Sequence, residues 1–149
     1  MYYVTKSWGA ERGLSCAFRQ WRATSHCRLI HGYALSFSIT FGAKQLDERN
    51  WVIDFGGLKP VKEWLEKMFD HTTLVAEDDP QLDLFATLHR EGLIQMVKVP
   101  HTGCEAVAQI VYEHVQQWLD DTADGRVWVQ KVSCREHDAN TATFTRGVK

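Results

Sequence analysis

The segment "ALSFSITFG", residues 34–42, alternates apolar and polar side chains without interruption. In an extended chain successive side chains point to opposite faces, so this alternation places every large apolar group on one face. The apolar set is Leu35, Phe37, Ile39 and Phe41. We therefore expect a long strand with one buried face. The polar residues 43–50 are expected to form a turn, and "WVIDFG" (51–56) a returning strand that Gly56 and Gly57 close.

Two amphipathic helices are expected to cover this strand. In residues 58–69, "LKPVKEWLEKMF", and in residues 104–119 the apolar side chains recur at steps of three and four. Thr102 and Glu105 in "TGCE" have the spacing of a capping box at the start of the second helix. Further strands are expected at residues 2–8, 94–99 and 126–136. This order predicts a single α+β domain over residues 1–149, with antiparallel strands and paired helices on one face.

Composition excludes several classes of protein. The chain has 149 residues, 44% of them hydrophobic, and a formal net charge of −2. No basic cluster suits nucleic acid, and no apolar run approaches the roughly 18 residues that span a bilayer. Neither a P-loop nor a G-x-G-x-x-G pattern supports a nucleotide-binding fold. The chain also lacks an apolar N-terminal segment, so we expect a cytoplasmic protein whose four cysteines are free thiols.

Some reactive side chains stand at the ends of expected elements. Cys27 and His31 are four residues apart, just before the long strand, and suit either zinc or nucleophile–base chemistry. Asp70 and His71 follow the first helix as a carboxylate-oriented base, or simply form the loop that stops it. Glu136 ends the last long strand, where it either accepts hydrogen bonds from a ligand or is a solvated carboxylate.

Three arginines surround Cys27 in "RQWRATSHCR" (residues 19–28). Guanidinium groups bind phosphate oxygens well, so Arg19, Arg22 and Arg28 are candidates to receive a phosphorylated ligand. The alternative is a solvated basic loop.

Taken as an ordered set, several motifs match a known family. They are "CRLIHGY", "VIDFGGLK", "FDHTTL", "TGCEAVA" and "SCREHDANTATF". In content and order this set resembles the 6-pyruvoyltetrahydropterin synthase and 6-carboxytetrahydropterin synthase family over residues 14–144. The resemblance implies a tunnelling fold, in which a four-stranded antiparallel sheet with two helices on one face assembles into a barrel. It also implies a homo-oligomer, a trimer or hexamer, with a zinc-dependent site between subunits.

The resemblance also implies roles for individual residues. Cys27 would be the catalytic cysteine, and Asp70 and His71 part of the proton-transfer triad. Glu136 would hold a pterin ring, with Thr102 and Glu105 near the same pocket.

Cysteine in "C-x-x-x-H-G" looks like the bacterial carboxytetrahydropterin synthase branch, which serves 7-deazaguanine and queuosine synthesis. Such a lyase converts 7,8-dihydroneopterin triphosphate to 6-carboxytetrahydropterin, acetaldehyde and triphosphate. The alternatives are a pyruvoyltetrahydropterin synthase, a dihydroneopterin aldolase-like activity, and a non-catalytic pterin- or purine-binding oligomer.

The zinc pattern departs from that of the family. The resemblance implies three histidine ligands, one in an early "F-x-A-A-H" segment and two in "H-G-H". Only His31 matches, because Tyr33 replaces the last histidine and the early segment offers Ala10, Arg12 or Cys16 instead. Either His26, with Cys16, completes a zinc site, or Cys27 is itself a ligand, or the metal has been lost.

Overall fold

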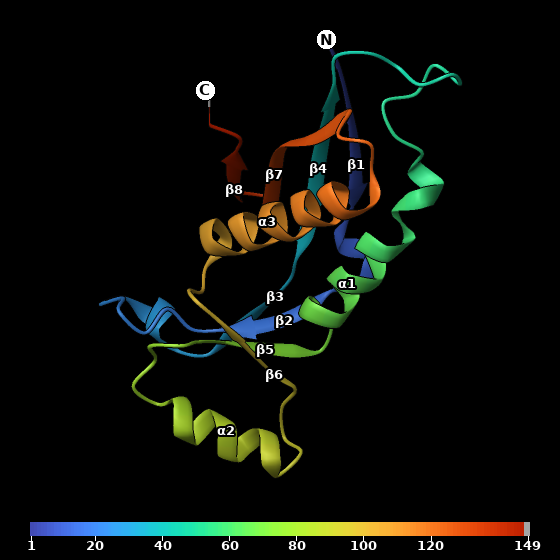
Figure 1. Cartoon of the computed structure of the whole chain (residues 1–149). Coiled ribbons are helices and arrows are strands. Elements are labelled where there is room, and N and C mark those ends of the chain that lie inside the picture. Colours follow the sequence, from blue (N-terminus) through green and yellow to red (C-terminus); the bar gives the residue numbers. More distant parts are fainter. Residues whose placement is uncertain (148–149) are drawn as a thin grey trace.

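The structure is a computed structural model that describes residues 1–147 of the chain. An antiparallel sheet of four strands, in the order β1-β4-β7-β8, forms the upper part of the molecule in the view of Figure 1. The strands are β1 (Tyr2–Trp8), β4 (Ser36–Ala43), β7 (Val127–His137) and β8 (Asn140–Thr145). β4 contains the alternating segment, and Phe37, Ile39 and Phe41 are at most 1% exposed. The expected buried face of this strand is confirmed.

Helices α1 (Lys59–Phe69) and α3 (Cys104–Thr122) cover the apolar face of this sheet (Figure 1). Phe69 at the end of α1 packs on Phe37 of β4, with ring centroids 5.1 Å apart. Trp64 of α1 stacks on His114 of α3 at 3.7 Å, which joins the two helices. The expected antiparallel sheet with two helices on one face is confirmed, and both helices were predicted from their periodicity.

A second sheet of four strands lies beneath the first and has the order β3-β2-β5-β6. Its strands are β2 (Ser15–Phe18), β3 (His31–Ala34), β5 (Thr72–Ala76) and β6 (Met96–Val99). β2 pairs antiparallel with β3 and parallel with β5, and β5 pairs parallel with β6. A third helix, α2 (Leu82–Arg90), connects β5 to β6 (Figure 1).

Two local expectations are wrong. Residues 51–56 do not form a strand, because this segment runs as a loop into a 3-10 helix, η3 (Phe55–Leu58). Asp54 caps that helix by accepting a hydrogen bond from the backbone N–H of Gly56 at 2.8 Å. No capping box forms at α3 either, since its N-cap is Gly103 and Thr102 bonds elsewhere.

Two further 3-10 helices flank β2. They are η1 (Ala10–Arg12) and η2 (His26–Arg28). None of the helices within residues 1–147 is both long and apolar enough to cross a bilayer.

Candidate functional site

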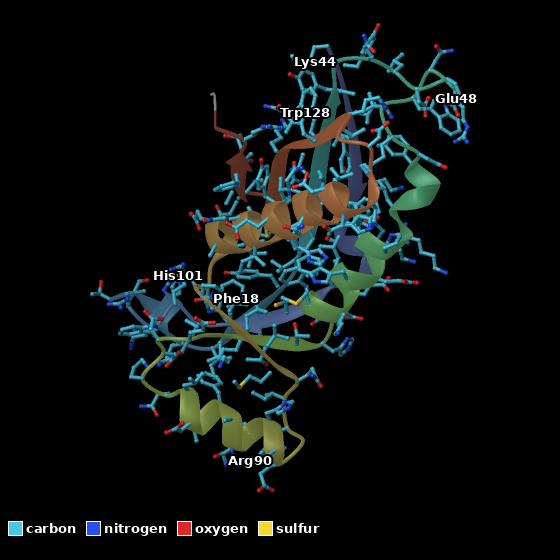
Figure 2. All side chains as sticks on the ribbon, in the orientation of Figure 1. Phe18, Lys44, Glu48, Arg90, His101 and Trp128 are labelled. Carbon is cyan, nitrogen blue, oxygen red and sulfur yellow. The ribbon has the colours of Figure 1, made fainter. Side chains whose placement is uncertain are left out.

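The β2–β3 hairpin gathers three rings on one face. Phe18 stands opposite His31 in the ladder, and Tyr33 lies two residues further along β3. The ring centroid of His31 is 5.3 Å from that of Phe18 and 5.3 Å from that of Tyr33, and the Phe18–Tyr33 distance is 6.1 Å. Figure 2 places Phe18 on the second sheet, on the side of the first turn of α3. We call Phe18, His31 and Tyr33 the aromatic triad.

The orientation of His31 is set by its own backbone. Nδ1 lies 2.7 Å from the carbonyl oxygen of Leu29, and a carbonyl only accepts hydrogen bonds, so Nδ1 carries the proton. In the neutral ring Nε2 is then the unprotonated nitrogen. This is how proteins hold a histidine that acts as a ligand or as a proton acceptor.

Cys27 lies in η2, in the loop that joins the two strands of the hairpin. Ser25 caps this turn, because its Oγ accepts a hydrogen bond from the N–H of Cys27 at 3.3 Å. Burial raises the pKa of Tyr33 above its usual value, and the nearby acidic groups of Glu136, Cys27 and Cys104 raise it further. Tyr33 also lies beside the end of β7, where its ring neighbours that of His137.

Glu136 and Glu105 line one polar cavity of about 350 Å³, together with Gln20 and Asn140. Glu136 sits at a bulge where the β7–β8 register shifts between Arg135 and His137. Bulges redirect side chains at the rims of sheets, and this one accounts for the half-buried Glu136 facing the cavity. The neighbouring His137 ring lies 6.0 Å from that of Tyr33, so the cavity and the aromatic triad adjoin.

Thr102 lies next to this cavity rather than in it. Its hydroxyl donates a hydrogen bond of 2.7 Å to the backbone carbonyl of Arg19. It lines a smaller cavity of about 170 Å³, and Gln20 belongs to the walls of both. Thr102 thus fixes the segment after β2 against the start of α3.

Asp70 and His71 form the predicted pair. Nδ1 of His71 lies 2.7 Å from Oδ1 of Asp70, and the His71 side chain is 85% exposed. His71 has a φ of 55°, a left-handed conformation that non-glycine residues rarely adopt. The pair precedes β5, whose Thr72 stands beside Cys16 near the start of β2, whereas Cys27 follows the end of β2. Within one chain the structure does not bring His71 to Cys27.

Two of the three arginines are committed to carboxylates. Arg19 donates to both oxygens of Asp79, through Nη2 at 2.6 Å and Nε at 2.8 Å, and this pair holds the pKa of Asp79 below its usual value. Arg22 pairs with the exposed Asp78 at 3.0 Å. Arg28 donates to the carbonyl of Ser25 at 3.1 Å. Arg19 and Arg22 therefore tie the loop to the segment that follows β5.

The donor set does not fit zinc. Within residues 1–147 no three histidine, cysteine, aspartate or glutamate side chains converge closely enough to hold a metal ion. His26 is exposed in η2. Cys16 faces Tyr33 across the hairpin, but burial raises the pKa of its thiol to about 11, while a zinc ligand must be a thiolate. Catalytic zinc is usually held by three protein ligands, and His31 supplies one.

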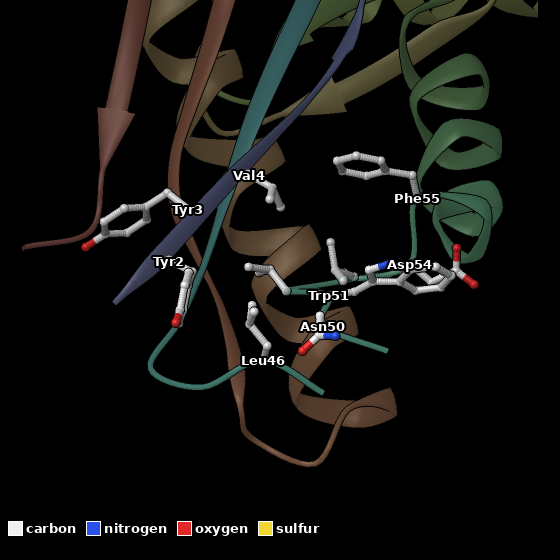
Figure 3. A pocket seen from close by; sticks show the side chains of 10 residues that line it. Tyr2, Tyr3, Val4, Leu46, Asn50, Trp51, Asp54 and Phe55 are labelled. Carbon is white, nitrogen blue, oxygen red and sulfur yellow. The ribbon is translucent and has the colours of Figure 1, made fainter. Parts of the chain in front are cut away.

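A larger cavity, of about 510 Å³, lies at the other end of the antiparallel sheet. Figure 3 shows it between the first residues of β1, which carry Tyr2 and Tyr3, and the segment from Trp51 to Phe55, the first residue of η3. Its wall is mostly apolar and contains neither histidine nor cysteine among the described residues. The polar cavity near Cys27 is therefore the better candidate site.

Comparison with known proteins identifies the family. The sequence model of the 6-pyruvoyl tetrahydropterin synthase family matches residues 9–147, nearly the whole chain. The chain belongs to this family. The expected membership, inferred from the ordered motifs, is confirmed.

Curated relatives carry the name 6-carboxy-5,6,7,8-tetrahydropterin synthase. The Rickettsia felis protein is 35% identical over 57 residues, which are 38% of this chain and 41% of that protein. The Aquifex aeolicus protein is 24% identical over 135 residues, which are 89% of this chain and 83% of that protein. The alignment with the Rickettsia protein thus spans about two fifths of its length.

Solved structures confirm the tunnelling fold. A Wolinella succinogenes protein superposes with a TM-score of 0.82 at 19% identity, covering 98% of each chain. The 6-pyruvoyl tetrahydropterin synthase of Plasmodium vivax superposes with a TM-score of 0.69 at 15% identity, covering 99% of this chain and 100% of that one. At these identities the likeness shows the fold alone.

Phe18 is the site residue that the sequence motifs did not single out. Its partner His31 is 13 positions away in the chain, and only the hairpin register places the two side by side. The signal that could have found it is the short apolar alternation of Leu14, Cys16 and Phe18 before the loop. His137 joins the site in the same way, through the bulge beside Glu136.

Proposed function

We propose that this protein is a pterin lyase of the 6-carboxytetrahydropterin synthase type. In the proposed reaction 7,8-dihydroneopterin triphosphate and water give 6-carboxytetrahydropterin, acetaldehyde and triphosphate, as a step of 7-deazaguanine and queuosine synthesis in the cytoplasm. The observation that carries the proposal is the polar cavity with Glu105 and Glu136, which adjoins Tyr33 and His31 of the hairpin whose loop carries Cys27. The curated relatives named 6-carboxytetrahydropterin synthase support the same reaction.

Glu136 is proposed to hold the pterin ring. An ionised carboxylate only accepts hydrogen bonds, and its two oxygens match the amino group and adjacent ring N–H of a pterin. The cavity of about 350 Å³ falls in the size range of small-molecule sites. Glu105, in the first turn of α3, faces the same cavity and would complete the ring contacts.

Cys27 and His71 are proposed to move protons at the pterin side chain. A thiol and an imidazole can each take up and release a proton, which suits general acid–base catalysis. Asp70 would orient His71 through the observed hydrogen bond of 2.7 Å. Because one chain keeps His71 away from Cys27, we propose that His71 of one copy meets Cys27 of another.

A homo-oligomer, a trimer or hexamer, is consistent with the strand order. β1 and β8 are the two edges of the antiparallel sheet, and each has a row of backbone groups without a partner strand in the described part of the chain. Proteins cover or pair such edges, and a barrel pairs them all. We therefore expect the purified protein to run as an oligomer in sedimentation, and a monomer at micromolar concentration would contradict this assembly.

The experiment that tests the function is product identification. The purified protein is incubated with 7,8-dihydroneopterin triphosphate, with and without added zinc, and the products are analysed by mass spectrometry. Formation of 6-carboxytetrahydropterin and acetaldehyde supports the lyase. A pyruvoyl pterin would indicate the 6-pyruvoyltetrahydropterin synthase reaction instead, and glycolaldehyde triphosphate with a hydroxymethyl dihydropterin would indicate an aldolase-like one.

A second candidate function is pterin or purine binding without turnover. The incomplete set of zinc ligands around His31 favours it, because the family reaction is expected to use zinc. In that case no product forms under either condition, while the pterin still binds with Glu136 as its anchor.

Replacing Glu136 by glutamine should weaken pterin binding about 10- to 100-fold, because hydrogen bonds to a charged group contribute about 1.5–3 kcal/mol. The amide keeps the size of the side chain but turns one acceptor into a donor that faces the donors of the ring. The measurement is a fluorescence titration with a dihydropterin. Glu113→Gln, on the exposed face of α3, is the matched control and should bind as the wild type does. Unchanged affinity in Glu136→Gln would refute the role of Glu136 as the pterin anchor.

A further inference from the structure

We infer that this site works without zinc, because His31, the one histidine that matches the family's zinc pattern, has Phe18 across the hairpin and Tyr33 along β3 as its neighbours in the aromatic triad, and neither supplies a second metal ligand. The absence of zinc is independent of the reaction that the site catalyses. The role of Tyr33 toward the substrate, assigned below, rests on the proposed pterin lyase.

The three side chains of the aromatic triad lie together on one face of the hairpin, but they supply only one atom suited to bind zinc. Phe18 and His31 are direct partners across the hairpin, and Tyr33 follows on the same face. Their ring centroids lie between 5.3 and 6.1 Å apart. Phenylalanine has no donor atom, and tyrosine is a poor zinc ligand as long as its hydroxyl is protonated. One imidazole nitrogen is then the only suitable donor of the three.

The other candidate donors do not replace the missing ones. His26 and Cys27 lie in η2, and neither forms a group of three ligands with His31 in the described part of the chain. Cys16 is 1% exposed, and its thiol lies 3.7 Å from the hydroxyl of Thr72, on the parallel strand. Its position is that of a buried core residue.

Tyr33 offers the site a different polar group. No hydrogen bond among residues 1–147 uses its hydroxyl, although the ring is packed against both Phe18 and His137. The Tyr33 ring lies 5.3 Å from that of His31 and 6.0 Å from that of His137, the neighbour of Glu136, so it stands between the hairpin and the end of β7 that carries the proposed ring anchor. With the proton in place the hydroxyl is a donor that suits an oxygen of the pterin side chain. We assign Tyr33 as a substrate-positioning residue.

The test of the metal-free site is the zinc content of the whole protein. Wild-type oligomer is purified without chelator and dialysed first against a zinc buffer and then against metal-free buffer. Its zinc content is then measured by inductively coupled plasma mass spectrometry. The same measurement is made on Phe18→His/Tyr33→His, which would complete three histidines on one face of the hairpin. We expect substoichiometric zinc in the wild type and about one ion per chain in the double variant.

Stoichiometric zinc in the wild type would overturn the inference, whichever subunits supplied the ligands. The wild-type result decides the question even where the double variant fails to fold.

Tyr33→Phe tests the role of Tyr33 toward the substrate, since it removes only the hydroxyl. We expect it to raise KM or lower kcat at least 10-fold with circular dichroism and oligomeric state unchanged, and full activity would refute the assigned role of Tyr33.

The two proposals fail in different ways. A wild type that lacks zinc and forms product without added metal supports both. One that lacks zinc and forms no product keeps the metal-free site and refutes the lyase. One that retains zinc and turns over only with it keeps the lyase and refutes the metal-free site.

Discussion

Cys27→Ala is expected to lower the turnover of 7,8-dihydroneopterin triphosphate about 100- to 10,000-fold, the usual contribution of a positioned acid or base. His71→Ala should lose activity on the same scale. Neither change should affect folding much, because Cys27 is half-buried in a short turn and the His71 side chain is 85% exposed. Turnover is measured by the release of acetaldehyde, and the two variants are compared with the wild type by circular dichroism.

Mixing the two inactive variants distinguishes a shared site from a site within one chain. If each site takes Cys27 from one copy and His71 from another, random hetero-oligomers of equal amounts of the two variants contain both residues in about a quarter of their sites. Activity should therefore return to about a quarter of the wild-type value. Each variant subjected alone to the same dissociation and reassembly is the matched control and should stay inactive.

The opposite outcomes are equally informative. A mixture that stays inactive while hetero-oligomers form would place Cys27 and His71 of the same chain in one site, against the separation seen along β2 and β5. Activity of either single variant near that of the wild type would remove that residue from the catalytic group. A wild type that releases no acetaldehyde would instead make pterin binding without turnover the better account.

The long periodic elements were predictable because burial alone determines them. The alternation in β4 and the apolar stripes of α1 and α3 persist over eight or more residues, so the pattern is clear without knowledge of the partner. β2 and β3 have only four residues each. Their sheet is completed by β5 and β6, which lie far away in the sequence. In β5 all five residues are buried, so no alternation marks it as a strand.

Segment 51–56 shows why a local pattern misleads. "WVIDFG" has the composition of a strand, but it cannot return beside β4 as expected, because β1 and β7 occupy both sides of β4. The segment turns instead, and Trp51 and Phe55 stay exposed. Helix α2 was not predicted, because Phe85 is its only buried residue. One buried side chain does not produce the repeated apolar positions that mark an amphipathic helix.

The reactive residues of the site could be listed from the sequence, but their neighbours could not. Cys27, His31, Asp70, His71 and Glu136 stand out by type and spacing. The contacts that define the site depend on strand register and on the bulge beside Glu136, which fix what faces His31 and Tyr33. A one-residue shift in the register would have put Ala17 in the place of Phe18.

Asp79→Ala should lower the free energy of unfolding by about 3 kcal/mol, a large part of the roughly 5–15 kcal/mol that stabilises a typical domain. The Asp79 side chain is 2% exposed, and its carboxylate accepts two hydrogen bonds from Arg19 and one, at 2.8 Å, from the N–H of Gln81. The backbone carbonyl of Arg19 in turn accepts from Thr102. Loss of the carboxylate leaves a guanidinium that is only 21% exposed without its counter-charge, and loosens the three loops that border the candidate site.

Urea denaturation of the oligomer at fixed protein concentration measures this effect, and Asp78→Ala is its matched control. The pair of Asp78 with Arg22 is exposed, with side-chain exposures of 42% and 73%, so its loss should cost no more than about 1 kcal/mol. Equal effects of the two variants would show that burial does not set the strength of the Arg19 pair.

The pH dependence follows from the lowered pKa of Asp79. A carboxyl group whose pKa is lower in the folded protein stabilises the fold above its unfolded pKa of about 3.9, and this contribution disappears as the pH falls through the folded value. The difference in stability between the wild type and Asp79→Asn should therefore be largest near neutral pH and shrink below about pH 4.

Removing both charges tests the cause: Arg19→Met/Asp79→Leu should recover most of the loss seen in Asp79→Ala, because the penalty arises from one unpaired buried charge. A double variant as unstable as Asp79→Ala would mean instead that the hydrogen bonds of this pair carry the stability, and that the loops of the site depend on them directly.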